Sequence, residues 1–286
     1  MDPAPPDELP KACEMCAAWA EPRPPFRLFG DSWYVGSEGL SSVVVRTTDG
    51  LVLLDGALPE MVSDTAARLG ELGLDPAQVR FVLVSHVHYD HVGGVAAWQR
   101  RTGAEVVATA PAAVALRAGV APPDDPQHGF GLEETSFPPV IGPIRTLADG
   151  EALTVGDTTF TLHATPGHTP GGSSWSWSSC DGDRCATVVY ADSLNPVSAE
   201  DYRFTDHPEV VEALRGSIRR VGALDCDLLV PVHPSFGRLF ELAERRDRQM
   251  GRSPGADLPL ETERRACEVY AENAEKRLNK RLKREQ

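Results

Sequence analysis

The sequence predicts an α/β fold of four layers, αββα, in which two β-sheets pack face to face and helices cover both outer faces. Two observations support this prediction. The chain of 286 residues divides into two halves, each a run of strands followed by a helix, with a seam near residue 150. Neither a flexible linker nor a change of composition separates the halves. We therefore expect a single domain over 1–286, with an irregular N-terminal lead-in over 1–25.

The first half begins with strands. Residues 26–55 alternate apolar and polar side chains around Gly36, Gly39 and the Asp49-Gly50 pair, a pattern typical of strands joined by hairpins. Apolar residues then recur at helical spacing, and a short apolar run follows them. This order predicts a helix over 59–72 and a buried strand over 81–84.

The second half repeats the pattern. Two short alternating segments flank Gly156-Asp157 and predict a hairpin, and further strand-like runs follow it. Strands are expected at 151–155, 158–162, 173–178 and 186–190. Asp206 is the expected N-cap of a helix over 210–221, because Pro208 stands at a position just inside its start.

Charge and hydropathy exclude two classes of partner. A formal net charge of −14 repels phosphate backbones, so we expect no nucleic-acid partner. No apolar run approaches the roughly 20 residues that cross a bilayer, so we expect no membrane partner. The basic C-terminal run, which has apolar residues at near-helical spacing from Ala266 to Leu282, is interpreted as a solvated helix face.

The six cysteines indicate an oxidising compartment. Two pairs stand away from the histidines and are interpreted as disulfides: Cys180 with Cys185, and Cys226 with Cys267. We therefore expect a periplasmic or secreted protein, although the start of the sequence lacks the shape of a secretory signal. Cys13 and Cys16 form a Cys-x-x-Cys without a following βαβ pattern, so a local bridge and free thiols both stay open.

The segment SHVHYDHVGG, residues 85–94, places three histidines and one aspartate within six positions directly after a buried strand. Because side chains alternate along an extended segment, His86 and His88 point the same way. Asp90 and His91 lie where the chain enters a Gly-rich helix start. Histidine and carboxylate at this density are typical of zinc ligands, and they indicate two neighbouring ligand sets.

Two further histidines complete the ligand count. His168 lies in TPGHTPGG and His233 in LLVPVHPS, and both follow strand-like runs. Strand-end loops gather functional side chains from distant parts of a chain, and glycines beside His168 let the backbone pass close to a metal. The remaining histidines lack ligand spacing and are interpreted as structural or surface residues: His128, His163 and His207.

The His-x-His-x-Asp-His pattern resembles the signature of the metallo-β-lactamase superfamily. Other segments resemble class B β-lactamases of the third subclass: CAAWAEPRPPFRLFG near the start, PPDDPQ at 122–127, YADSLNPVSAEDYRF at 190–204 and CDLLVPVHPSFGRLFELAERR from Cys226. The resemblance spans nearly the whole chain. It implies a zinc-dependent hydrolase that opens the β-lactam ring of penicillins, cephalosporins and carbapenems and so confers antibiotic resistance.

The resemblance also implies the roles of individual residues. It assigns two Zn²⁺ ions, one to His86, His88 and His168, and one to Asp90, His91 and His233. A zinc-bound hydroxide would attack the lactam carbonyl, with Asp90 orienting it and Tyr202 helping to hold the oxyanion. Ser193 is expected to bind the substrate carboxylate, and it stands in the segment where the other two subclasses carry a cysteine ligand.

Two positions depart from the related enzymes. Asn195 stands where a Thr or Ser usually contacts the substrate carboxylate; it can donate a hydrogen bond, but with a different reach. Asp201 stands where Gly is common, and its added negative charge disfavours anionic antibiotics by like-charge repulsion. The preferred antibiotic is therefore not predicted.

Two alternatives compete with this interpretation. The first is another hydrolase of the same superfamily, acting on thiolesters or lactones in the manner of glyoxalases, in which Asp192 bridges both metals. The second is a zinc-binding protein without catalysis, which three protein ligands per metal disfavour because they leave a position open. We expect a β-lactam as the small-molecule partner, a second-layer role for Asp192, and a monomer.

Overall fold

The computed structural model describes residues 5–11, 13–250, 260–263 and 265–286. Its strands form two sheets, in the orders β1-β2-β3-β4-β5-β6-β7 and β12-β11-β10-β9-β8. The first contains β1 (Phe26–Phe29), β2 (Ser32–Tyr34), β3 (Val43–Thr47), β4 (Gly50–Leu54), β5 (Val79–Leu83), β6 (Glu105–Ala108) and β7 (Ile144–Thr146). The second contains β8 (Ala152–Val155), β9 (Thr158–Ala164), β10 (Ser173–Asp181), β11 (Arg184–Ala191) and β12 (Leu228–Pro231).

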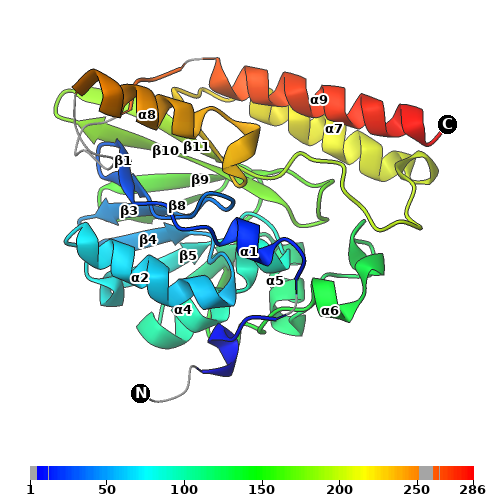
Figure 1. Ribbon diagram of the computed structural model, residues 1–286, viewed down its shortest axis with the longest axis horizontal. Coiled ribbons are helices and arrows are strands. Elements are labelled where there is room, and N and C mark those ends of the chain that lie inside the picture. The colour runs from blue at the N-terminus through cyan, green and yellow to red at the C-terminus, as the bar shows by residue number, and fades with distance from the viewer. Residues whose placement is uncertain (1–4, 12, 251–259, 264) are drawn as a thin grey trace.

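Helices cover both outer faces of the paired sheets. The helices in the described part of the chain are α1 (Cys16–Trp19), α2 (Val62–Glu71), α3 (Tyr89–Val92), α4 (Val95–Thr102), α5 (Ala110–Ala118), α6 (Leu132–Thr135), α7 (Pro208–Gly222), α8 (Leu239–Met250) and α9 (Ala266–Arg284). Figure 1 shows α2 and α4 on one side of the molecule and α7 with α9 on the opposite side. The predicted αββα sandwich is confirmed.

Three apolar clusters hold these layers together. The central cluster lies between the sheets and contains Trp175 and Trp177. A second packs the first sheet against its helices, with Trp98 of α4 fully buried. The third packs the second sheet against α7 and α9 and includes Tyr270. Because the first sheet is covered on both faces, its strand β4 is apolar on both faces, whereas β10 of the second sheet alternates tryptophans with serines.

The topology brings strand ends from both halves of the chain together. Strands β4 to β7 run parallel in the first sheet, and β11 and β12 run parallel in the second. Parallel strands present their carboxyl ends at one edge of a sheet, where ligands bind in α/β proteins. The segments that follow β4, β5, β9, β11 and β12 carry the polar residues described below.

Three disulfides are present among the described residues. Two confirm the expected bridges, Cys180–Cys185 and Cys226–Cys267, and the third joins Cys13 to Cys16. Of the two possibilities left open for Cys13 and Cys16, the structure contains the local bridge. Within the ranges described above, no helix has the length and apolar character needed to span a membrane.

One local prediction is wrong. Helix α7 begins at Pro208, with His207 at the N-cap position and no side-chain capping bond. Asp206 instead ends a separate 3₁₀ turn, Phe204–Asp206, whose first residue is fully buried. Burial of Phe204 holds this turn against the core, so the chain reaches helical geometry only after Asp206.

Candidate metal centre

Six side chains converge where the strands end. The two sets whose donor atoms lie within 4.8 Å of one another are His86, His88 and His168, and Asp90, His91 and His233. All are buried except His233, which is partly exposed. The sequence therefore predicted which residues meet, although the resemblance rather than the spacing divided them into two sets.

The short helix α3 explains how one segment serves both sets. After β5 the chain is extended as far as His88, which occupies the N-cap position of α3. The rings of His86 and His88 lie 4.9 Å apart, and each lies 4.8 to 4.9 Å from the ring of His168. Asp90 and His91 fall in the single turn of α3, so they point to the neighbouring position.

Hydrogen-bond partners from elsewhere in the fold hold one ring nitrogen of His88, His168 and His233, and a buried carboxylate oxygen lies near one ring nitrogen of His86 and of His91. The pairs are His86 Nδ1 with Asp192 Oδ1 (2.9 Å), His88 Nε2 with both Asp125 oxygens (3.2 Å), His168 Nδ1 with the Asn195 carbonyl (2.7 Å), His233 Nδ1 with the Gly39 carbonyl (3.1 Å) and His91 Nδ1 with Asp55 Oδ2 (3.4 Å). Such acceptors fix the tautomer and leave the opposite nitrogen free to bind a metal.

The charges of the centre fit a cation. Burial would raise the pKa of Asp90, but His91 and His233 hold it well below its ordinary value. Burial lowers the pKa of His168 to about 3, with His88 contributing, so its ring is neutral as a ligand must be. Burial also opposes charge on His91, yet Asp90 and Asp55 raise its pKa to about 10. This position therefore attracts positive charge.

The ring nitrogens that face the centre of the site show whether its residues fit a metal. The Nε2 atom of His86 is buried and has no hydrogen-bond partner among the described residues. The Nε2 atoms of His91 and His233 face each other at 3.3 Å, with Asp90 Oδ2 within 3.0 and 3.3 Å of them. Buried polar atoms are normally paired, and a cation in each donor set would satisfy these atoms. The residues fit a metal.

Sequence reasoning anticipated Asp192 behind His86 but missed two other carboxylates behind the histidines, Asp55 and Asp125. Asp55 follows β4 directly, is fully buried and has a positive φ of 58°. It accepts hydrogen bonds from the Ser85 amide (2.8 Å), the Ser85 hydroxyl (2.6 Å) and the Tyr190 hydroxyl (2.9 Å), which fix it beside His91. Its place at a strand end was a usable signal. Asp125, in a loop 37 residues from His88, offered none.

A cavity of about 400 Å³ opens onto the metal groups. Ser193 and Asn195, the residues that the resemblance associates with the substrate carboxylate, line it, and their contact with a substrate stays a prediction. Tyr202 is not among the residues that line it: its ring stacks on His207 at 4.2 Å, and its hydroxyl is buried without a partner in the part of the chain that the structure describes. The oxyanion role that the resemblance implies for Tyr202 is not tested by this geometry, and a place outside the cavity lining does not favour it.

The N-terminal lead-in forms one wall of this cavity. Cys13, Met15 and Trp19 line it, and the Trp19 ring lies 5.8 Å from that of His233. No local pattern indicates this contact, because the lead-in over 1–25 is expected only to be irregular. The other three histidines bond elsewhere: His128 to the Ala121 carbonyl, His163 to the Ser176 hydroxyl and His207 to Glu209.

Known proteins are similar to this chain in sequence and fold. Residues 36–233 match the family model of the metallo-beta-lactamase superfamily. A B3 metallo-beta-lactamase with an active-site glutamic acid is 42% identical, with 98% of each chain covered and a TM-score of 0.86. MEM-A1, a subclass B3 metallo-beta-lactamase from a soil metagenome library, is 38% identical over 93% of this chain and 98% of that chain, with a TM-score of 0.85. MIM-1 from Novosphingobium pentaromativorans is 39% identical over 93% and 92%, with a TM-score of 0.83. The chain belongs to the metallo-beta-lactamase superfamily, among its subclass B3 members.

Proposed function

We propose that this protein is a di-zinc hydrolase that opens the β-lactam ring of antibiotics. One observation carries the proposal: two sets of three donors lie side by side, buried at the floor of a cavity. The metallo-β-lactamases to which the chain is similar support the substrate class. A cavity of this size suits a small molecule.

Zinc is the proposed metal, and two ions are proposed because there are two donor sets. Imidazole nitrogens with one carboxylate suit zinc, and three protein donors per ion leave positions for water and substrate. When bound, zinc supplies Lewis acidity toward the lactam carbonyl and makes water nucleophilic at neutral pH.

The residues of the chain bind and orient the substrate. The hydroxyl of Ser193 and the amide of Asn195 donate hydrogen bonds to the substrate carboxylate, since both residues line the cavity. The carboxylate of Asp90 orients the attacking water. Trp19 and Phe236 contribute apolar walls that exclude bulk water from the reacting bond.

The position of Asp192 weighs against the rival thiolester or lactone hydrolase. Its Oδ1 atom lies 2.9 Å from His86 Nδ1, and its Oδ2 atom accepts a hydrogen bond from Thr165 Oγ1 at 3.0 Å. Both oxygens are thus engaged behind His86, and Asp192 belongs to neither donor set. This geometry supports an orienting role instead of a metal-bridging one.

We also propose that the enzyme is exported. Three disulfides are typical of proteins that mature in an oxidising compartment such as the periplasm. Carbapenems are included among the proposed substrates on the strength of the sequence resemblance, and the monomeric state stays a prediction.

A hydrolysis panel tests the function. Zinc-loaded protein should open a penicillin, a cephalosporin or a carbapenem, and a chelator should abolish the activity until zinc is restored. His168→Ala should remove activity, whereas His163→Ala, a histidine of β9 outside both donor sets, should keep it. Failure of the zinc-loaded protein to open any member of the three classes would refute the proposal.

A further inference from the structure

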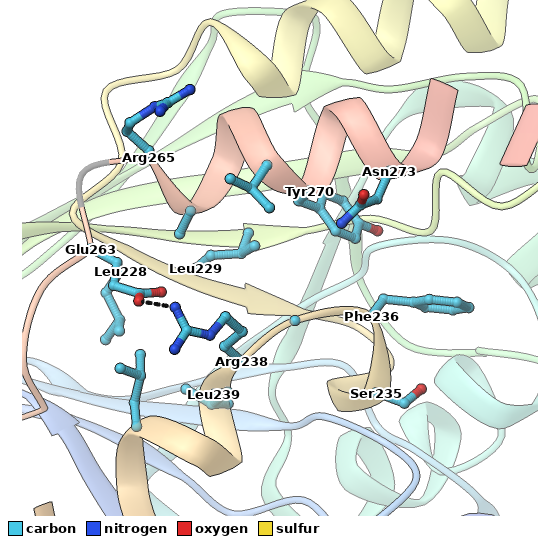
Figure 2. Close-up of a pocket in the computed structure, with 14 residues that line it drawn as sticks. Leu228, Leu229, Ser235, Phe236, Arg238, Leu239, Glu263, Arg265, Tyr270 and Asn273 are labelled. Carbon is cyan, nitrogen blue, oxygen red and sulfur yellow. Dashed lines mark hydrogen bonds and ion pairs between the residues drawn. The ribbon is translucent and has the colours of Figure 1, made fainter. Parts of the chain in front are cut away.

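A second cavity, of about 550 Å³, lies next to the first. Figure 2 shows it between β12, the turn that follows β12, and the first turns of α9. Ser235 and Phe236 line both cavities, so they form a shared wall. Its volume lies within the range of small-molecule sites.

The side chains around this cavity select for a neutral ligand. Leu229, Leu239 and Val269 give it apolar walls. Arg238 is already paired with Glu263 at 2.6 Å and with Glu241 at 2.6 Å, and Figure 2 shows the first of these pairs inside the cavity. Arg265, the other arginine at the cavity, is paired with Glu268 at 2.8 Å. Because these charges are already balanced and the pairs are partly exposed to solvent, an ionic ligand would only exchange one solvated ion pair for another and would gain little.

A flat aromatic ring meets these walls better than an aliphatic chain does. The planar guanidinium of Arg238 offers a face on which an aromatic ring can stack without breaking its ion pair. Asn273 and Ser235 supply hydrogen-bonding groups at the cavity. The chemistry therefore favours a ring of one or two cycles that carries a single hydrogen-bonding group.

Two contacts connect this cavity to the metal centre. On one side the ring of Phe236 meets that of His233 edge-on, with centroids 6.0 Å apart. On the other side the hydroxyl of Tyr270, a residue that lines the cavity, donates a 2.7 Å hydrogen bond to the Asp192 carbonyl. Asp192 in turn holds His86. Movement of Phe236 would therefore be transmitted to His233. Movement of Tyr270 would be transmitted through Asp192 to His86, so each donor set is affected through one histidine.

We propose that the second cavity binds a small neutral aromatic molecule and that its occupancy slows turnover at the metal centre. The effect on turnover rests on the proposed β-lactam hydrolysis, whereas the binding does not. A ligand that moves Phe236 or Tyr270 shifts a metal-binding histidine, and displacements of about 1 Å are enough to slow catalysis markedly.

Indole is a suitable probe of binding. A ligand of this size should bind with a dissociation constant on the order of 1 mM. NMR titration should show saturable binding to both metal-free and zinc-loaded protein, and crystals soaked in indole should show it against Arg238 and Phe236. Absence of saturable binding, or indole found only in the metal cavity, would overturn the proposal.

A matched pair of variants locates the site in solution. Val269→Trp places a large ring in the cavity, and the 42% exposure of Val269 makes the change tolerable on α9. It should weaken indole binding at least about tenfold, equivalent to 1.4 kcal/mol. Ile141→Trp, at a position that is 86% exposed and lines neither cavity, should leave binding unchanged. If Val269→Trp does not fold, the crystals of the parent protein soaked in indole still show whether indole occupies the second cavity.

Steady-state kinetics with a chromogenic cephalosporin tests the effect on turnover. Indole should lower kcat several-fold without changing KM in the parent and in Ile141→Trp, and should have no effect in Val269→Trp. A rise in KM alone would mean competition at the metal cavity, and an unchanged kcat at saturation would show no coupling; either result contradicts the proposal. If no β-lactam is hydrolysed at all, the proposed function is wrong. The NMR titration and the soaked crystals still show whether the second cavity binds indole.

Discussion

Replacing both Cys226 and Cys267 by alanine should lower the free energy of unfolding by about 4 kcal/mol. This disulfide joins the segment before β12 to the first turn of α9, across a sequence separation of 41 residues. The loop-entropy relation for a closed loop of this length gives about 4 kcal/mol at 25 °C. Alanine is the right substitute because both cysteines are buried, and serine would add an unpaired hydroxyl.

The Cys180–Cys185 bridge provides a matched control, because its sequence separation is only 5. The same relation gives about 2 kcal/mol for its loss. Urea denaturation of both double variants, in metal-free buffer so that ligand binding adds nothing, should therefore show a difference of about 2 kcal/mol. Equal losses, or a larger loss for Cys180 and Cys185, would refute the argument from loop length.

Three more substitutions test the metal centre and its surroundings. Asp192→Asn should weaken zinc binding about 10- to 100-fold in a chelator competition, because the amide orients His86 less firmly; unchanged affinity would contradict this role. Gly172→Ala should lower the free energy of unfolding, measured in urea, by ~1–3 kcal/mol, because the new Cβ would lie 2.3 Å from Asp192 Oδ2. Gly70→Ala is the control: there is open space around Gly70, so this change should not destabilise the protein. Tyr202→Phe should leave kcat for β-lactam hydrolysis unchanged, because the hydroxyl lies outside the cavity lining; a large fall in kcat would establish it as an oxyanion donor.

Local patterns predicted the elements that depend on local forces. The hairpin around Gly156-Asp157 formed as β8 and β9, because alternation and a turn pair act within a few residues. The metal motif was equally readable, since His86, His88, Asp90 and His91 share one segment after a strand. His168 and His233 followed from the same rule about strand ends.

Long-range pairings could not be predicted in this way. Asp125 meets His88 across 37 residues, and the Gly39 carbonyl meets His233 across 194. Nothing in either local sequence specifies its partner. The fold of the first half of the chain brings Asp125 to His88, and the packing of the two sheets brings Gly39 to His233. The error at Asp206 has the same origin: its capping signals were sound locally, but burial of Phe204 determined where helix α7 begins.

The wall formed by Cys13, Met15 and Trp19 has a practical consequence for purification and inhibitor screening. Thiol reductants used during purification would open the Cys13–Cys16 bridge that ties this wall together. Reduced and oxidised preparations would then present differently shaped mouths to the same compound. Potencies should be ranked on protein kept free of such reductants.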